Sequence, residues 1–309
     1  MLTIDQILTE QLKKAKPKIE KTFDSERIAA LGVRQLQILL QKNHPNWELS
    51  PDLYFTKFLN FMLKHTKLRE ITLKSPDYGS QTRYVWGNPS IHAIALSLKS
   101  NSYLSHQTAL ILHGLIDGPA ARVYVNREQS PKPKGSGLSQ ESLTKAFANK
   151  QRESKLTYAY RKAQIVMLNG KFTDRLGVEK IRLAKRELLD VTDLERTLID
   201  VTVRPNYAGG AKAVLSAYRQ ARGRISVDKL LTFLKRFDYV YPYHQAIGFY
   251  LEKASYPESD WAPFMKLGVS FEFYLTHGLP PDREFDSTWS LYYPKNLIDF
   301  RKRIRAVFS

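Results

Sequence analysis

DLERTLIDVTVRPNYAGG, residues 193–210, is the stretch from which the organisation of the second half of this sequence can be read. Asp193, or the threonine before it, is placed to cap a helix whose apolar residues recur at helical spacing. Pro205 disfavours further helix at the residue before it, and Gly209-Gly210 can turn the chain. The stretch therefore predicts a helix, a tight turn and a second helix over residues 211–221.

Arg196 and Asp200 stand four positions apart within this stretch. Residues at that spacing lie on one face of a helix, and opposite charges there commonly form an ion pair. The residues alone predict a pair on the helix surface.

Two other segments complete a pattern with ERTLID, residues 195–200. They are YLSHQTALILHGLIDGPAARVYVN, residues 103–126, and YPYHQAIGFYLEKASY, residues 241–256. In this order, and following a helical N-terminal region, the segments resemble the AbiEi-type antitoxins over residues 1–275. The long N-terminal region and the continuation past residue 256 depart from the shorter members of that family.

The resemblance implies a function that composition and spacing do not give. AbiEi-type proteins are described as transcriptional regulators of type IV toxin-antitoxin operons in phage defence. The resemblance therefore implies that the protein represses its own operon. It also implies a functional partner, a nucleotidyltransferase-type toxin encoded beside this protein. No toxin-contact residue is carried over from the family.

The composition is that of a folded protein with two domains. The chain has 309 residues, of which 43% are hydrophobic and 12% aromatic, which is too many for a disordered chain. It has neither an apolar run of about 18 residues nor a basic segment followed by an apolar one at its start. We therefore expect a cytoplasmic protein.

The formal net charge of +18 indicates the class of partner. A field of this sign attracts polyanions, so nucleic acid is the first candidate. The basic excess is spread along the chain, and a single basic tail does not account for it. Because the chain has no cysteine, it has no disulfide, thiolate nucleophile or cysteine-bound metal.

Residues 1–95 read as a winged helix-turn-helix domain. We expect helices over residues 4–19, interrupted at Pro17, and over residues 25–42, with a break near Gly32. A third helix over residues 50–66 would begin with Ser50 as N-cap and Pro51 in its first turn. Two strands separated by a polar turn follow, over residues 68–73 and 82–87.

The third helix is the one we expect in the major groove, with the hairpin along the phosphate backbone. Its outward side chains and those of the hairpin give the candidate DNA contacts. They are Thr56 and Asn60 for base edges, and Lys57, Lys64, Lys67, Arg69, Lys74 and Arg83 for phosphates. Palindromic operators would require a homodimer or two copies.

A rival register uses ERIAALGVRQLQILL, residues 26–40. Gly32-Val33 would be the turn of the helix-turn-helix, and Arg34, Gln35 and Gln37 would face DNA. This segment lies farther from the predicted hairpin.

Residues 96–309 are predicted to form a mixed α/β domain, which makes the whole chain α+β. We place the domain boundary within residues 88–102. Strands are expected over residues 121–125 and, before a turn at Asn169-Gly170, over residues 156–168. Four basic residues near Phe147 could track RNA or a second stretch of DNA, or form a solvated helix face: Lys145, Lys150, Arg152 and Lys155. A basic helix is expected to end the chain, with Arg301, Lys302, Arg303 and Arg305.

Enzymatic motifs are absent from the sequence: it has no phosphate-binding loop, nucleophile elbow or dinucleotide-binding glycines. His106 and His113 lack the spacing of a metal pair. We expect no catalytic residue, cofactor or metal. Two alternatives remain open: an RNA- or protein-binding module of a defence system without operator binding, and a divergent Mg²⁺-dependent nuclease assembled from dispersed carboxylates.

Overall fold

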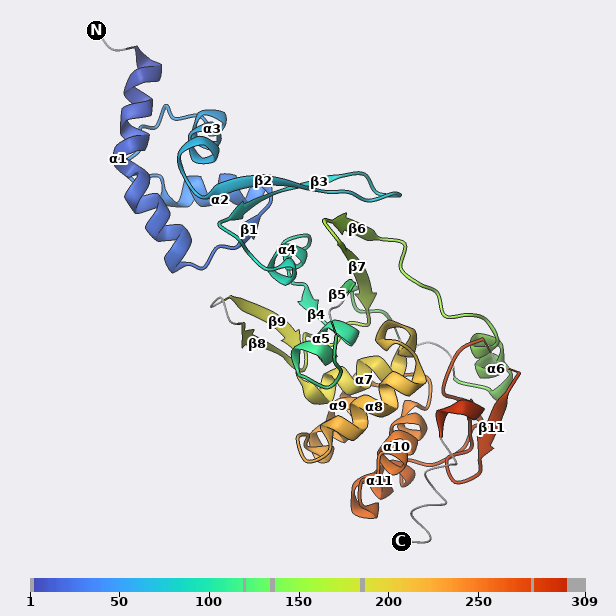
Figure 1. The fold of residues 1–309 in the computed structure, drawn as a ribbon. Helices are drawn as coiled ribbons and strands as arrows, with labels where there is room; N and C mark the ends of the chain where they lie inside the picture. The colour runs from blue at the N-terminus through green and yellow to red at the C-terminus, as the bar shows by residue number, and fades with distance from the viewer. Residues whose placement is uncertain (1–2, 119–120, 134–136, 184–186, 279–280, 299–309) are drawn as a thin grey trace. The chain divides into compact units, whose positions relative to one another are not determined.

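The computed structural model describes residues 3–118, 121–133, 137–183, 187–278 and 281–298 (Figure 1). The chain forms two compact units. Unit 1 comprises residues 1–102, 155–167 and 180–190, and unit 2 comprises residues 103–154, 168–179 and 191–309. The first division follows Ser102, and two later segments belong to unit 1. The predicted basic helix near the C-terminus lies outside the described residues.

Unit 1 begins with a winged helix-turn-helix. Its elements are α1 (Ile4–Ser25), β1 (Ala30–Leu31), α2 (Val33–Asn43), α3 (Phe55–His65), β2 (Leu68–Leu73) and β3 (Gln81–Trp86). The three strands form an antiparallel sheet in the order β1-β3-β2. β2 and β3 pair from Leu68↔Trp86 to Leu73↔Gln81 and form the wing (Figure 1). The predicted α+β class and the predicted winged helix are confirmed.

The core of unit 1 gathers the apolar faces of its three helices. Trp47 stacks on Phe58 of α3 at 5.9 Å between ring centroids, and its indole Nε1 donates a hydrogen bond to Thr22 Oγ1 of α1 at 3.0 Å. Leu12 and Met62 are fully buried beside them. This packing fixes α3 with one face inward, which leaves its opposite face to solvent.

Three predicted helix limits in unit 1 are wrong. α1 runs through Pro17 to Ser25, because Pro17 is exposed and water can satisfy the carbonyl that its missing N–H leaves free. Residues 26–32 are not helical, since Ala30–Leu31 pairs with β3. Ser50 accepts a hydrogen bond from the Asp52 amide in a turn, and α3 begins at Phe55.

Unit 1 also contains α4 (Ile91–Leu96), β6 (Thr157–Tyr160) and residues 163–167 of β7 (Ala163–Gly170), and β6 and β7 form a hairpin. Lys74 and Ala159 exchange two backbone hydrogen bonds, of 3.1 and 2.7 Å, so the hairpin pairs with the wing just past the end of β2, beside the turn that leads to β3. Its turn is at Arg161, whose φ is 52°. The turn that the sequence predicted at Asn169-Gly170 is therefore wrong, because Gly170 still belongs to β7.

Unit 2 is built of helices beside short strands. In chain order the further elements that belong wholly or partly to unit 2 are β4 (Tyr103–Leu104), α5 (His106–Leu112), β5 (Arg122–Glu128), α6 (Gln140–Ala148), β8 (Val178–Arg182), β9 (Leu188–Thr192), α7 (Leu194–Val203), the 3-10 helix η1 (Pro205–Ala208), α8 (Ala211–Ala221), α9 (Val227–Phe237), α10 (Tyr243–Lys253), α11 (Glu258–Met265), β10 (Phe273–Tyr274), β11 (Arg283–Asp286), β12 (Leu291–Pro294) and η2 (Lys295–Leu297). One sheet has the order β6-β7-β5-β4-β9-β8, and three of its strands contain residues of both units. The other has the order β10-β12-β11.

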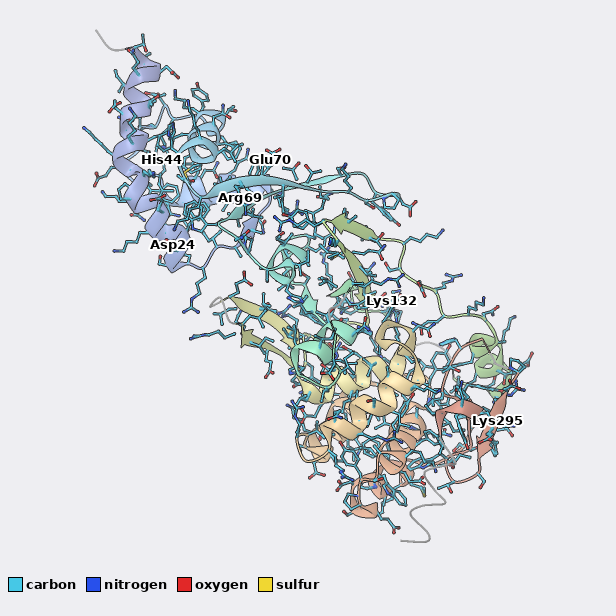
Figure 2. The ribbon with its side chains drawn as sticks, in the orientation of Figure 1. Asp24, His44, Arg69, Glu70, Lys132 and Lys295 are labelled. Carbon is cyan, nitrogen blue, oxygen red and sulfur yellow. The ribbon has the colours of Figure 1, made fainter. Side chains whose placement is uncertain are left out.

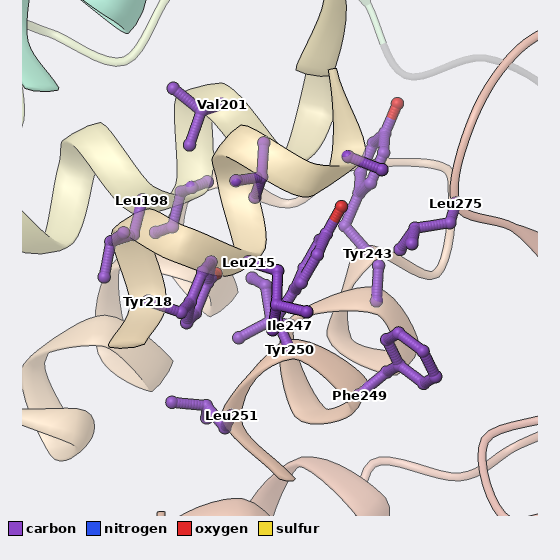
Figure 3. Packing of buried hydrophobic residues seen from close by; sticks show 14 of the residues in the cluster. Leu198, Val201, Leu215, Tyr218, Tyr243, Ile247, Phe249, Tyr250, Leu251 and Leu275 are labelled. Atoms are coloured by element: carbon purple, nitrogen blue, oxygen red, sulfur yellow. The ribbon is translucent and has the colours of Figure 1, made fainter. Parts of the chain in front are cut away.

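The helix, turn and helix predicted from residues 193–210 are confirmed. Asp193 caps α7 by accepting a hydrogen bond from the Arg196 amide at 2.8 Å. Gly209, with φ of 94°, ends η1 in the left-handed region, and α8 covers Ala211–Ala221. α7, α8 and α10 pack their apolar faces together, as Leu198, Leu215 and Ile247 show in Figure 3. No helix among the described residues is long and apolar enough to cross a membrane.

Candidate nucleic-acid interface

The outward face of α3 carries a row of three polar side chains. Thr56, Asn60 and Lys64 follow each other at intervals of four and are exposed, while Phe58 and Met62 on the opposite face are fully buried. Within the described part of the chain, none of the three makes a side-chain hydrogen bond or an ion pair. They therefore form a polar row that is free to contact a ligand, and we call it the α3 row.

Lys57 stands apart from the α3 row. Its Nζ lies 2.6 Å from Asp5 Oδ1 of α1, and its side chain is only 18% exposed. A phosphate would have to displace this carboxylate to reach the ammonium. Lys57 therefore forms an ion pair that links α3 to α1.

Lys67 and Arg69 lie at the base of the wing and have partners of their own. Lys67 Nζ is 3.6 Å from Asp24 Oδ2 and lies over the Trp86 ring. The Arg69 guanidinium donates to Gly87 O and to Asn88 Oδ1. Both side chains remain exposed, and Figure 2 labels Arg69 on β2 and Asp24 on α1. Each is held in place and still accessible to a phosphate.

Lys74 is the predicted phosphate contact nearest the tip of the wing. Its backbone is paired with Ala159, and its side chain is exposed without a hydrogen bond or ion pair among the residues described. The backbone pairing fixes where this ammonium emerges. Like Lys64 of the α3 row, Lys74 is therefore an exposed cation of unit 1 without a partner among the described residues.

The prediction that Arg83 contacts a phosphate is wrong. Arg83 is 8% exposed, and its guanidinium donates to the carbonyls of Ser97, the C-cap of α4, and Leu98, the residue after it, at 3.1 and 3.2 Å. Burial lowers the pKa of this guanidinium, yet an arginine stays charged in proteins. Its charge serves to cap α4 against the wing.

The rival register lacks the first helix that it requires. Residues 26–32 hold β1, so Gly32 joins a strand to α2 and does not turn one helix into another. Gln35 Oε1 accepts a hydrogen bond from the Gly32 amide at 2.8 Å, which commits that side chain to the start of α2. Arg34 and Gln37 are exposed on α2.

Sequence reasoning missed two basic residues of unit 1. Arg161 and Lys162 occupy the turn between β6 and β7, and both are exposed. This hairpin is the one bonded to Lys74 beside the turn of the wing. The Arg-Lys pair between two β-prone runs is a signal for this turn, but Asn169-Gly170 is the stronger turn signal, so the prediction places the turn there.

Unit 2 centres on the Arg196–Asp200 pair, which the sequence placed on the surface. The pair is buried, with side chains 3% and 9% exposed and 2.8 Å between Arg196 Nε and Asp200 Oδ1. Arg196 also donates to Thr173 Oγ1 and Leu176 O, each at 2.8 Å, and to Tyr103 Oη at 3.1 Å. Three protein segments thus meet on one guanidinium.

A carboxylate on β5 supports the same network. Glu128 accepts hydrogen bonds from the Tyr103 hydroxyl at 3.0 Å and the Thr173 amide at 3.0 Å. Burial raises the pKa of Glu128, but the hydrogen bonds from Thr173, Arg175 and Tyr103 outweigh it and leave this pKa below its ordinary value. Glu128 therefore holds the loop after β7 as an ionised carboxylate.

A cavity of about 1160 Å³ opens in unit 2. Arg196, Asp200 and Arg204 of α7 and its C-cap form part of its wall, together with residues of the loops after β5, α6, β7 and α9. Lys150 and Arg152, which the sequence associated with Phe147, line this cavity, whereas Phe147 is buried and stacks on His277 at 4.2 Å. Phe147 is thus unable to stack on a base.

The two histidines of the α5 region have separate partners. His106 Nδ1 is 2.8 Å from Ser105 Oγ, and His113 Nε2 is 2.6 Å from Thr192 O. His106 is 6% exposed with φ of 51°, a conformation uncommon outside glycine. Burial first, and then the charges of Arg204 and Arg196, hold the pKa of His106 well below its ordinary value. His106 is therefore a neutral side chain in the wall of the cavity.

Comparisons with known proteins give a fold and no family. No family model matches the sequence, and no functionally described protein matches it significantly. Among solved structures, the chain is similar to the RV2827C protein from Mycobacterium tuberculosis, with 12% sequence identity and a TM-score of 0.52 over 97% of this chain and 95% of that one. At this identity the likeness concerns the fold alone, and it extends over both units.

Proposed function

We propose that this chain is a DNA-binding transcriptional regulator that inserts α3 into the major groove of its own operator. The α3 row is the observation that supports this most. Asn60 has both a donor and an acceptor for an adenine edge, Thr56 offers a hydroxyl and a methyl group, and Lys64 reaches a guanine edge or a phosphate. In the part of the chain that the structure describes, none of the three has a partner to give up.

The wing supplies the electrostatic part of the proposal. Lys67, Arg69 and Lys74 project from β2 or the residue on either side of it, and each remains exposed. Phosphate contacts of this kind position a protein without reading sequence. Each contact is expected to add about 0.9 to the slope of log affinity against log salt.

The further role we propose is that of an antitoxin. It rests on the resemblance to AbiEi-type proteins in residues 103–126, 195–200 and 241–256. The protein would repress an operon that encodes a nucleotidyltransferase-type toxin, oppose that toxin, and bind a palindromic operator as a homodimer or as two copies. The buried Arg196–Asp200 pair of ERTLID has a structural role, so it is no candidate for toxin contact.

A reporter experiment in cells tests the proposal. The DNA that precedes this coding region is fused to a reporter gene, and the chain is supplied from a second plasmid, as wild type or as Asn60→Ala/Lys64→Ala. Repression by the wild type and its loss in the variant support the regulator. Equal reporter expression with and without the wild-type chain contradicts it.

The antitoxin role is tested separately by co-expression. The neighbouring open reading frame is induced alone and together with this chain, and growth is followed. Growth arrest that the chain relieves supports the role. A toxic neighbour that the chain fails to neutralise leaves the chain a regulator without antitoxin activity and contradicts this part of the proposal.

A further inference from the structure

We infer that the cavity of unit 2 binds a nucleotide, with its phosphate at Arg204 and its base against Phe172. All the side chains that carry this inference belong to unit 2. The inference is independent of operator binding, which we assign to unit 1.

Arg204 is the anion-binding group of this site. It is the C-cap residue of α7, is partly exposed, and lies over the Tyr207 ring at 5.9 Å. Its guanidinium has no hydrogen bond or ion pair among the residues that the structure describes. Arg196, only two helical turns away, has every nitrogen engaged. A planar guanidinium with free donors suits the oxygens of a phosphate.

The other charges around the cavity favour an anion. Lys150 and Arg152 line it and are exposed. Lys171 also lines it, and its Nζ donates to the backbone carbonyl of Asp238 at 2.6 Å. The wall has two carboxylates, Asp200 and Asp238, and the charge of Asp200 is balanced by Arg196. His106 adds no charge because it is neutral. The balance of the wall is therefore positive.

Aromatic and amide groups make a nucleotide a better match than a simple anion. Phe172 lines the cavity with 42% of its surface exposed, which provides a face on which a base can stack. Gln151 also lines it, and both its Oε1 and Nε2 are shielded from solvent without a hydrogen-bond partner among the residues that the structure describes. A buried amide without partners is unfavourable unless a ligand satisfies it. The edge of a base offers both a donor and an acceptor.

The size of the cavity is compatible with this ligand. Its volume of about 1160 Å³ is somewhat larger than that of typical small-molecule sites, which range over roughly 300–1,000 Å³. It can thus hold one nucleotide and admit a second. A free nucleotide and the end of a single-stranded RNA present the same chemistry, and the experiment has to separate them.

Calorimetric titration of the full-length chain tests the inference. The probes are ATP, GTP, CTP and UTP, each alone, then inorganic phosphate, adenosine, and a single-stranded RNA of twelve nucleotides. The expected result is binding of at least one nucleotide, tighter than phosphate or adenosine. If the RNA binds tightly and free nucleotides bind at least tenfold more weakly, the ligand of the cavity is the end of an RNA strand. If nucleotides bind at least as well as RNA, the ligand is a free nucleotide.

Three variants connect the binding to the cavity. Arg204→Gln removes the free guanidinium, and Phe172→Ala removes a ring that is 42% exposed, so we expect the fold to tolerate its loss. Each is expected to weaken nucleotide binding by about tenfold or more, since a charged hydrogen bond and a stacked base each contribute on that scale. Arg236→Gln, at an exposed arginine near the end of α9, is the matched control and should bind like the wild type.

Two outcomes overturn the inference. The first is that none of the probes binds the wild-type chain. The second is that phosphate binds as tightly as every nucleotide while Phe172→Ala has no effect, which would make the cavity a plain anion site. Operator binding by the same variants is expected to stay unchanged, so failure here is distinguishable from failure of the regulatory proposal.

Discussion

Arg196 and Asp200 form an ion pair, 2.8 Å from Nε to Oδ1, inside unit 2, where the two side chains are 3% and 9% exposed. Arg196 further bonds Thr173, Leu176 and Tyr103. Taking two charges out of water is costly, and good geometry with additional hydrogen bonds offsets that cost. The ERTLID signature thus connects α7 with the start of β4 and with the loop after β7.

Asp200→Ala is expected to destabilise the protein by about 3–5 kcal/mol, because it leaves the Arg196 charge buried without its partner. Urea denaturation followed by circular dichroism measures the change. Lys180→Ala is the matched control, since it breaks a pair with Asp190 in which the lysine side chain is 66% exposed. It should cost about 1 kcal/mol or less. Equal costs for the two variants would contradict a structural role for the buried pair.

Arg83→Met and Lys74→Met should separate structure from binding in the wing. Arg83→Met removes hydrogen bonds to the end of α4, so we expect a lower thermal midpoint and an unchanged salt slope of DNA binding. Lys74→Met removes a free, exposed cation, so we expect an unchanged midpoint and a salt slope smaller by about 0.9. Melting curves and binding at four salt concentrations give both quantities. The reverse assignment of the two effects would restore Arg83 as a phosphate contact.

Gly248→Ala is expected to destabilise unit 2 by about 1–3 kcal/mol or more. A Cβ at this position of α10 would lie 2.0 Å from the ring of Trp289, which is fully buried and donates to Glu252 Oε2. Thermal unfolding followed by tryptophan fluorescence measures the loss. Gly137→Ala is the control, because a Cβ there meets nothing within 4 Å. If Gly248→Ala melts like Gly137→Ala, the described packing of α10 against Trp289 is wrong.

His106→Asn should reduce the loss of stability in acid. The pKa of His106 is held well below 6.5 by burial, Arg204 and Arg196, so below pH 6.5 the unfolded chain binds a proton that the native chain does not. Stability therefore falls as pH falls through this window, by up to about 1.4 kcal/mol per pH unit for such a group. Asn tolerates the left-handed backbone at this position.

The measurement for His106 is the free energy of unfolding at pH 7.5 and 5.5 in both proteins. His92, His244 and His277 also have lowered pKa values, so the variant keeps part of the acid sensitivity. The wild type should lose more stability than His106→Asn between the two pH values. Equal losses would show that His106 titrates normally in the native protein.

Local signals in the sequence were enough for much of the fold. Asp193 as a cap, Pro205 as a stop and Gly209 as a left-handed turn each act within a few residues, so α7 and α8 were predicted at their observed places. Ser50 and Pro51 carried an equally good capping signal, yet the buried side chains of Leu49 and Leu53 hold this segment in a turn. Tertiary packing there overrides a local preference.

The direction of a side chain on a strand was harder to predict. Arg83 lies on β3 among the buried residues Tyr84, Val85 and Trp86, and only its contact with α4 shows that it points inward. The Arg196–Asp200 pair is similar, because spacing places two charges on one helix face and does not say what covers that face. Predicted contacts at Thr56, Asn60 and Lys64 needed only the helical period, and these side chains are exposed on α3.

The cavity of unit 2 could not be predicted from the sequence. Arg204, Gln151 and Phe172 come from three separate segments, and none of them stands in a recognisable ligand-binding motif. The network around Arg196 and Glu128 fixes the loop after β7, which carries Phe172, beside α7, whose C-cap is Arg204. Such a site follows from long-range contacts, and no local pattern reports it.

Binding of the purified chain to the DNA that precedes its coding region, against a scrambled fragment of equal length and across a salt series, tests the central claim most directly. The wild type should prefer its own fragment by a factor of about 10³ or more. Asn60→Ala should lose most of this preference, whereas Arg34→Ala on α2 should keep it. Equal affinity of the wild type for the two fragments at every salt concentration would contradict the claim that α3 reads an operator.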